Sequence, residues 1–126
     1  MQYSHSRIGV FEKCPYKYKL QYVDRLKTLP DDDPINALIL GHAMHTGIEK
    51  GVQSGINEYY MSYPIISDKH VNEAIKLEYF IPKVRELLEP GGTFEMRVMG
   101  GDFIGYLDYV TKNDDGTYNI FDFKYS

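Results

Sequence analysis

The chain is poor in residues that crosslink a protein or anchor it in a membrane. It has one cysteine, Cys14, no tryptophan and no long apolar run. A single cysteine excludes an internal disulfide and is typical of a reducing compartment. The absence of about 18 consecutive apolar residues and of a secretory signal segment predicts a cytoplasmic protein with no membrane partner.

Basic charge is also scarce, because 14 lysines and arginines stand against 18 acidic residues, a net charge of −4. This balance excludes binding of nucleic acid through bulk positive charge. A polyanion would have to meet a local basic patch or a metal ion. With 43% hydrophobic residues in 126, the composition predicts one globular domain over residues 1–126.

Helical patterns fill the first two thirds of the chain, and Pro90-Gly91-Gly92 separates them from a β half. Four helices are predicted: Ser6, as the cap, to Lys13; Pro15 to Val23; about Ile35 past Val52; and residues 69–88, with Asp68 as the cap and a kink or break at Pro82. In the third, spacings of 3 and 4 predict one buried stripe, formed by Leu38, Gly41, His45, Ile48 and Val52.

The β half contains three strand-like runs. Residues 93–99 alternate apolar and polar side chains, and Gly100-Gly101 is the predicted turn, which places Glu95 opposite Tyr106. Residues 104–108 and 120–124 flank a loop that ends in Gly116, and this loop length places Asp108 opposite Asp122. The expected fold is α/β, of the α+β kind, with helices covering both faces of a three-stranded antiparallel meander.

Directly opposed carboxylates on apolar strands predict a site for a divalent cation, because like charges placed there repel each other unless an ion lies between them. Lys124 shares a strand face with Asp122, and Glu95 lies on that face too. Mg²⁺ and Mn²⁺ take carboxylate oxygens, and an imidazole such as that of His45 suits Mn²⁺ better. The alternatives are a solvated Asp122–Lys124 pair, a core histidine, and a Glu95 that only pairs with a neighbouring cation.

Two further sets of residues have functional interpretations. His42, His45 and Glu49 stand at helical spacing and form a rival set for zinc, although no third-ligand motif follows them. Basic and aromatic residues alternate around the second helix, where Lys13, Tyr16, Lys17 and Lys19 could contact a phosphodiester strand. The simpler interpretation is an amphipathic helix with buried tyrosines and solvated lysines.

Several short motifs, in this order, resemble those of the PD-(D/E)XK nucleases, most closely the RecB-type branch of recombination and phage exonucleases and CRISPR spacer-acquisition nucleases. The motifs are residues 11–18, Gly41 with His45, Glu95, Gly105 with Asp108, and Asp122-Phe123-Lys124. The resemblance implies the core of a restriction-endonuclease-like fold and metal-dependent hydrolysis of DNA in recombination, repair or phage DNA processing, in a bacterial or phage-infected cell.

The same resemblance implies roles for individual residues. The side chains of His45, Asp108 and Asp122 and the backbone carbonyl of Phe123 would hold Mg²⁺ or Mn²⁺. Asp108, Asp122 and Lys124 would be catalytic, with Lys124 assisting the attacking water. Glu95 and Glu49 would support the site from outside the ligand set.

The chain departs from this family in two respects. Some relatives hold an iron–sulfur cluster with four cysteines, which Cys14 alone cannot do, so we expect Cys14 to be a small buried thiol at a helix junction. The family fold also continues beyond the last motif, so we expect a C-terminally incomplete domain whose sheet edge a protein partner or a second copy completes. An inactive module that binds DNA or protein is therefore the alternative function.

Overall fold

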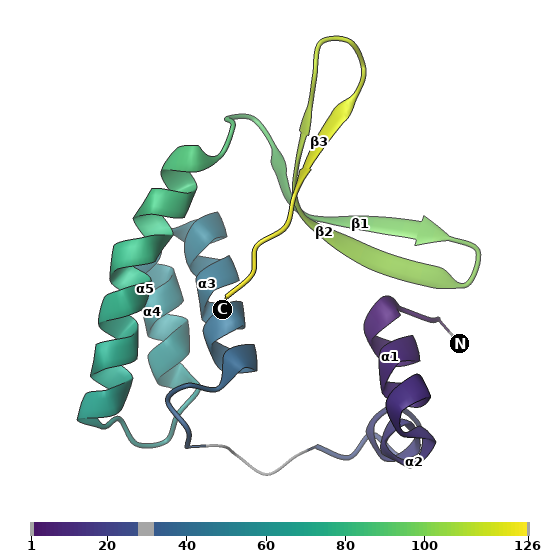
Figure 1. Cartoon of the computed structure of the whole chain (residues 1–126), viewed down its shortest axis with the longest axis horizontal. Helices are drawn as coiled ribbons and strands as arrows, with labels where there is room; N and C mark the ends of the chain where they lie inside the picture. Colours follow the sequence, from purple (N-terminus) through teal and green to yellow (C-terminus); the bar gives the residue numbers. More distant parts are fainter. Residues whose placement is uncertain (1, 28–31, 126) are drawn as a thin grey trace.

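The computed structural model describes residues 2–27 and 32–125 and confirms the α+β architecture, with a bundle of three helices beside a twisted sheet (Figure 1). The elements are α1 (His5–Lys13), α2 (Pro15–Tyr18), η1 (Lys19–Val23), α3 (Ala37–Lys50), α4 (Val52–Met61), α5 (Asp68–Leu87), β1 (Thr93–Gly100), β2 (Phe103–Lys112) and β3 (Tyr118–Phe121). None of the described helices has the length and apolar character needed to cross a bilayer.

The N-terminal helices begin at side-chain caps. Ser4 caps α1 by accepting a hydrogen bond from the Arg7 amide at 3.2 Å, so the prediction of Ser6 as the cap is wrong. Pro15 occupies the first turn of α2 as predicted, and η1, a short π-helix, continues this helical stretch to Val23. Cys14 caps α2 through its sulfur and is exposed, which corrects the expectation of a buried thiol.

The single helix expected past Val52 is two helices in the structure. Asn36 caps α3 with a side-chain oxygen that accepts from two backbone amides, so the helix begins at Ala37 and not at Ile35. Gly51 then takes a φ of +117°, a conformation that excludes a continuous helix and that glycine adopts at little cost. The chain turns there, and α4 packs back along α3.

The buried face of α3 differs from the predicted stripe. Its buried residues are Leu40, Ala43, Met44, Gly47 and Ile48, so Ile48 is the one member of the predicted stripe that is buried in α3, whereas Leu38 is 83% exposed. Both sets recur at spacings of 3 and 4, so periodicity alone could not choose between them. The choice follows from helix packing, because α4 lies so close that a Cβ on Gly55 would stand 2.7 Å from the Ala43 carbonyl oxygen.

Helix α5 begins with a capping box in which Ser67, and not Asp68, is the cap. The Ser67 amide donates to Nδ1 of His70 at 3.0 Å, so the His70 Nε2–H is left to donate to the Asp32 carbonyl at 3.1 Å. Pro82 lies inside α5 without dividing it.

Three buried donors hold the segment that leads into α3. His70 binds the carbonyl of Asp32, the Tyr63 hydroxyl donates to that of Asp33 at 2.7 Å, and the Tyr59 hydroxyl donates to that of Pro34 at 2.8 Å. These contacts tie the segment before α3 to α4, α5 and the loop between them.

Stability should fall at alkaline pH because of Tyr59. Burial first, and then its neighbours Tyr63 and Glu73, raise the pKa of Tyr59 well above its ordinary value of about 10. When the pH rises above about 10, Tyr59 loses its proton in the unfolded chain but keeps it in the folded chain. The free energy of unfolding therefore decreases with rising pH, by at most about 1.4 kcal/mol per pH unit.

Urea unfolding from pH 8 to pH 11 should show this slope in the wild type and a shallower one in Tyr59→Phe. The variant should also be about 1 kcal/mol less stable at pH 8, because it lacks the hydrogen bond to Pro34. Tyr106→Phe, at an exposed position, is the control. Parallel curves for Tyr59→Phe and the wild type would contradict the assignment.

The sheet has the predicted order β1-β2-β3, but the register between β1 and β2 differs from the prediction. Gly100 pairs with Phe103, so the turn is Gly101-Asp102, with Gly101 at a φ of +60°. Arg97 is the residue opposite Tyr106. The two-residue shift keeps every side chain on its predicted face and moves Glu95 opposite Asp108.

The register between β2 and β3 agrees with the prediction up to the end of β3. The Asn113 amide donates to the Thr117 carbonyl at 2.7 Å, with Gly116 at a φ of +87°. The last pair is Tyr109 with Phe121, so the predicted strand over residues 120–124 is too long and Asp122 is not a ladder partner of Asp108. Residues 122–125 leave the sheet and run toward α3 (Figure 1).

The helices do not cover both faces of the sheet, contrary to the expectation. Val98 and Tyr106 project from opposite faces of the β1–β2 hairpin, and both are exposed. Figure 1 shows the reason: β1–β2 and β2–β3 form two arms that diverge from a common crossing, and only the crossing lies beside the α3–α5 bundle. The candidate site lies at this crossing.

Candidate metal centre

His45 joins the helical bundle to the end of the sheet. It projects from α3, and its Nε2 lies 2.8 Å from the carbonyl oxygen of Phe123. The amide of Phe123 in turn donates to Oδ2 of Asp108 at 2.8 Å. The backbone of one residue beyond β3 therefore orients both the imidazole and the carboxylate.

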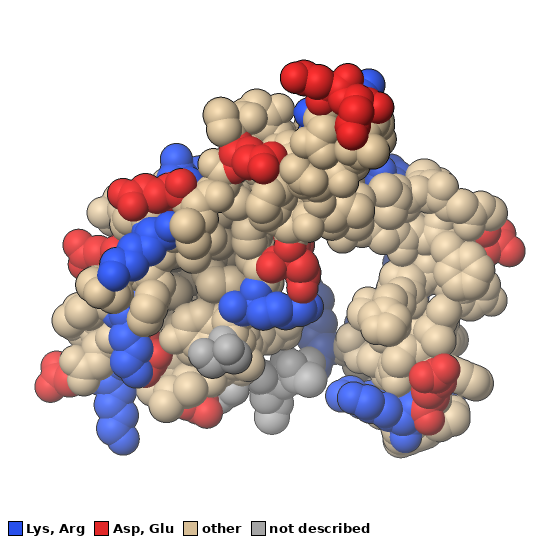
Figure 2. Space-filling view, turned by 45° about the horizontal axis from the view of Figure 1, so that its top comes forward, with Lys and Arg blue, Asp and Glu red and all other residues tan. Residues whose placement is uncertain are grey.

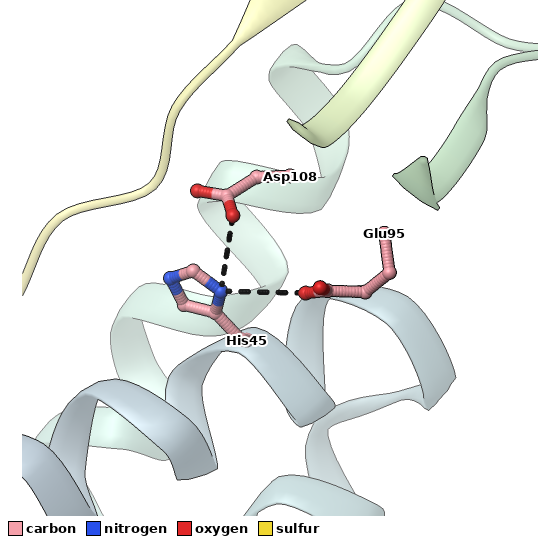
Figure 3. Close-up of side chains that lie close together, drawn as sticks. All are labelled: His45, Glu95 and Asp108. Atoms are coloured by element: carbon pink, nitrogen blue, oxygen red, sulfur yellow. Dashed lines mark ion pairs between the residues drawn. The ribbon is translucent and has the colours of Figure 1, made fainter. Parts of the chain in front are cut away.

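The contact with Phe123 determines the tautomer of the neutral imidazole. A carbonyl can only accept, so Nε2 carries a proton, and in the neutral ring Nδ1 presents a lone pair. That lone pair faces two carboxylates, with Oδ1 of Asp108 at 3.6 Å and Oε1 of Glu95 at 3.8 Å (Figure 3). Both separations exceed a hydrogen-bond length, which leaves room for an ion between the three groups.

The three groups fit a hard divalent cation. Their donor atoms all lie within 4.8 Å of one another, and no other trio of histidine, cysteine or acidic residues in the described part of the chain does so. An octahedral ion with bonds of about 2.1 Å separates its ligand atoms by about 3 to 4.2 Å, so small side-chain adjustments would suffice. A metal-bound histidine whose other nitrogen donates to a carbonyl is also a common arrangement.

The rival zinc set on the helix does not form. His42 is instead paired with Glu58 of α4, with Nε2 and Oε1 2.8 Å apart. Among the described residues, Glu49 joins no group with metal-ligand spacing, and it lines a groove beside His45. The prediction that Glu49 supports the site remains a proposal.

Glu95 enters the group through an unusual backbone conformation. Its φ is +50°, in the left-handed region, where a side chain other than glycine costs about 1–2 kcal/mol. The β1–β2 ladder pairs the residues on either side and skips Glu95 and Asp108. Strain of this kind persists where the surroundings enforce it and often marks a functional position. No pattern in the sequence could have shown it.

Asp122 and Lys124 lie at the rim of the group. Oδ2 of Asp122 is 3.3 Å from Nζ of Lys124, and the two side chains are 61% and 81% exposed. Interaction with the Asp108 carboxyl, followed by the Lys124 ammonium, lowers the pKa of Asp122. Asp122 is outside the group with metal-ligand spacing and does not pair with Asp108 in the ladder, so its predicted role as a ligand remains a proposal.

The lysines proposed to contact DNA lie apart from this group. Lys13, Lys17 and Lys19 are exposed on α1, α2 and η1, and Tyr16 beside them is exposed as well. In Figure 1 these helices are separated from α3. Basic and acidic side chains are scattered over the face shown in Figure 2, and no continuous basic surface appears on it.

A groove of about 840 Å³ runs along α3 and ends at the metal group. Its walls come from α3 between Ala37 and Lys50, with Glu58 from α4 and Glu95 from β1. His45 and Glu95 are thus shared by the groove and the group of ligands.

Comparison with known proteins gives one match. The family model of the PD-(D/E)XK nuclease superfamily matches residues 2–126. No curated protein and no solved structure matches the chain.

Proposed function

The chain belongs to the PD-(D/E)XK nuclease superfamily, and we propose that it hydrolyses DNA with Mg²⁺ or Mn²⁺ held by His45, Asp108 and Glu95. Superfamily membership gives a nuclease-type function that depends on divalent metal ions. The observation that supports this particular site is the approach of the His45 Nδ1 lone pair to two carboxylate oxygens at 3.6 and 3.8 Å. Asp122 adds a third carboxylate beside Asp108.

Each residue has a role that follows from its position. A divalent ion bound here supplies charge that polarises a phosphoryl oxygen and acidifies a water molecule. His45 is held in the ligand tautomer by the Phe123 carbonyl, whose predicted role as a direct ligand remains a proposal. Lys124 carries an exposed ammonium group beside Asp122, where it can stabilise the charge that develops on the cleaved phosphate.

The finer assignment is an exonuclease of the RecB type that acts in recombination, repair or phage DNA processing. Support comes from the order of Gly41 with His45, Gly105 with Asp108, and Asp122 with Lys124. The imidazole in the ligand set favours Mn²⁺ over Mg²⁺.

One observation favours the alternative of an inactive module that binds DNA or protein. Lys124 lies beyond the last strand, 81% exposed, and the ion pair with Asp122 is the only polar contact found for its side chain among the described residues. In that case the metal group would bind its ion without hydrolysis.

Purified protein should release nucleotides from linear DNA when Mn²⁺ or Mg²⁺ is added and should stop when EDTA removes the ion. Calorimetry should show saturable Mn²⁺ binding in the same preparation, and readdition of Mn²⁺ should restore the activity. Mn²⁺ binding with no release of nucleotides would support the inactive module. Hydrolysis that continues undiminished in EDTA would exclude the proposed centre.

A further inference from the structure

The groove along α3 is continuous with the metal group, because His45 and Glu95 belong to both. A nucleotide whose phosphate lies at His45 could therefore place its sugar and base in the groove. The groove volume of about 840 Å³ falls in the range of pockets that hold drug-sized molecules, and a nucleoside is of that size.

Gly41 forms part of the groove without any packing reason for being glycine. A Cβ added there would meet no heavy atom within 4 Å, whereas one on Gly47 would strike the Ile81 side chain. Glycine inside a helix costs about 1 kcal/mol relative to alanine. Helix packing accounts for that cost at Gly47 but not at Gly41 or at Gly9 of α1, and of these two glycines only Gly41 lines the groove.

Leu38 stands one turn before Gly41 on the groove side of α3 and is 83% exposed. Residues three or four apart share a face of a helix, so Leu38, Gly41 and His45 form one row. The row begins with an exposed apolar side chain, continues over bare backbone and ends at the imidazole that faces the carboxylates.

The charge of the walls limits what can occupy the groove. Glu49, Glu58 and Glu95 line it, whereas Lys50 is its one lysine and His42 is already paired with Glu58. The acidic walls would repel a second phosphate, whereas they would not repel a neutral nucleoside. A base pair would bring the phosphates of the opposite strand to the same walls.

We propose that this groove binds the unpaired nucleoside next to the cleaved phosphate, with Gly41 as the residue that lets the nucleoside lie against the backbone of α3. Leu38 provides the apolar surface for its base. The inference rests on the proposed nuclease function and adds to it a preference for single-stranded DNA or DNA ends that are unpaired at the site.

Steady-state hydrolysis of a single-stranded oligonucleotide with Mn²⁺ tests this proposal. Gly41→Leu should raise KM about tenfold or more with a much smaller change in kcat, because the side chain blocks binding and leaves the metal group intact. Its Mn²⁺ affinity should equal that of the wild type, and its thermal midpoint should not fall. Gly9→Leu on α1, where a Cβ also meets nothing within 4 Å, should leave KM unchanged.

An oligonucleotide with abasic positions on either side of the cleaved bond provides a second measurement. Loss of the base should raise KM for the wild type and add little to the KM of Gly41→Leu, because the groove is already blocked. A wild-type KM for Gly41→Leu in an active preparation would overturn this inference and leave the nuclease function standing. A loss of Mn²⁺ affinity in Gly41→Leu would also overturn it, since the effect would then act through His45. A wild-type protein that neither binds nor hydrolyses DNA would overturn both.

Discussion

Asp108→Asn should greatly weaken divalent-ion binding and DNA hydrolysis while leaving the fold intact. Asp108 contributes one oxygen at 3.6 Å from His45 Nδ1 and uses the other to accept from the Phe123 amide at 2.8 Å. Asparagine has the same shape, and its amide oxygen can still accept from Phe123. The substitution removes the negative charge that a hard cation requires.

We expect Mn²⁺ affinity to fall about 100-fold and kcat/KM about 10³-fold, the latter equivalent to about 4 kcal/mol of transition-state stabilisation. Calorimetry and a nucleotide-release assay measure the two quantities. Asp114→Asn, in the exposed β2–β3 loop, is the matched control and should behave as the wild type. If Asp108→Asn bound Mn²⁺ with wild-type affinity, the ion would have to lie elsewhere.

Lys124→Met should have the second large effect, and it should act on hydrolysis alone. The ammonium group lies 3.3 Å from Asp122 and is 81% exposed, so its loss costs little stability. Methionine keeps a long unbranched side chain and removes the charge. Because Lys124 binds no ion, Mn²⁺ affinity should remain close to that of the wild type.

The expected loss in kcat is about 10²–10⁴-fold, the usual range for a side chain that takes part in proton transfer or charge stabilisation in the transition state. Lys112→Met at the far end of β2 is the control and should retain full activity. Equal rates for Lys124→Met and the wild type would remove Lys124 from the mechanism. Normal Mn²⁺ binding together with a greatly reduced rate would separate its role from that of Asp108.

Local signals in the sequence predicted the strand register of the β2–β3 hairpin correctly and that of the β1–β2 hairpin incorrectly. Gly116 defines the β2–β3 loop because it alone there takes a positive φ, and the register follows from the loop length. Between β1 and β2, Gly100-Gly101-Asp102 allows two neighbouring choices of turn. Pairing along the whole of both strands decides between them, and sequence spacing does not report that pairing.

Three residues of the α3 stripe that was predicted to be core, Leu38, Gly41 and His45, line the groove, and Ile48 of the same stripe is in the core. The apolar spacing of the stripe was real, but the other face, with Leu40 and Met44, is the one that packs into the core. Helix–helix contacts of that kind join residues far apart in the chain, so a pattern within one helix does not contain them. A stripe that includes both glycine and histidine could have been interpreted as a surface for a ligand.

The residues of the candidate group were all singled out from the sequence, but Asp122 was expected among the ligands and Glu95 outside them, whereas the structure groups Glu95 with His45 and Asp108. His45 and Asp108 lie together as expected from the resemblance. Glu95 was placed on the correct face but two residues out of register. The Phe123 carbonyl reaches the imidazole because residues 122–125 leave the sheet after Phe121. The sequence pattern of residues 120–124 predicted instead that the strand continues.

The left-handed residue at the crossing has a mechanical consequence. Glu95 and Asp108 stand where the β1–β2 ladder is interrupted, so two of the three candidate ligands belong to the sheet at that interruption. Anything that draws the Glu95 and Asp108 side chains together also stiffens the sheet at that point. We therefore expect ion binding to narrow the range of angles between the two arms, which distance measurements between labels on the arms would detect.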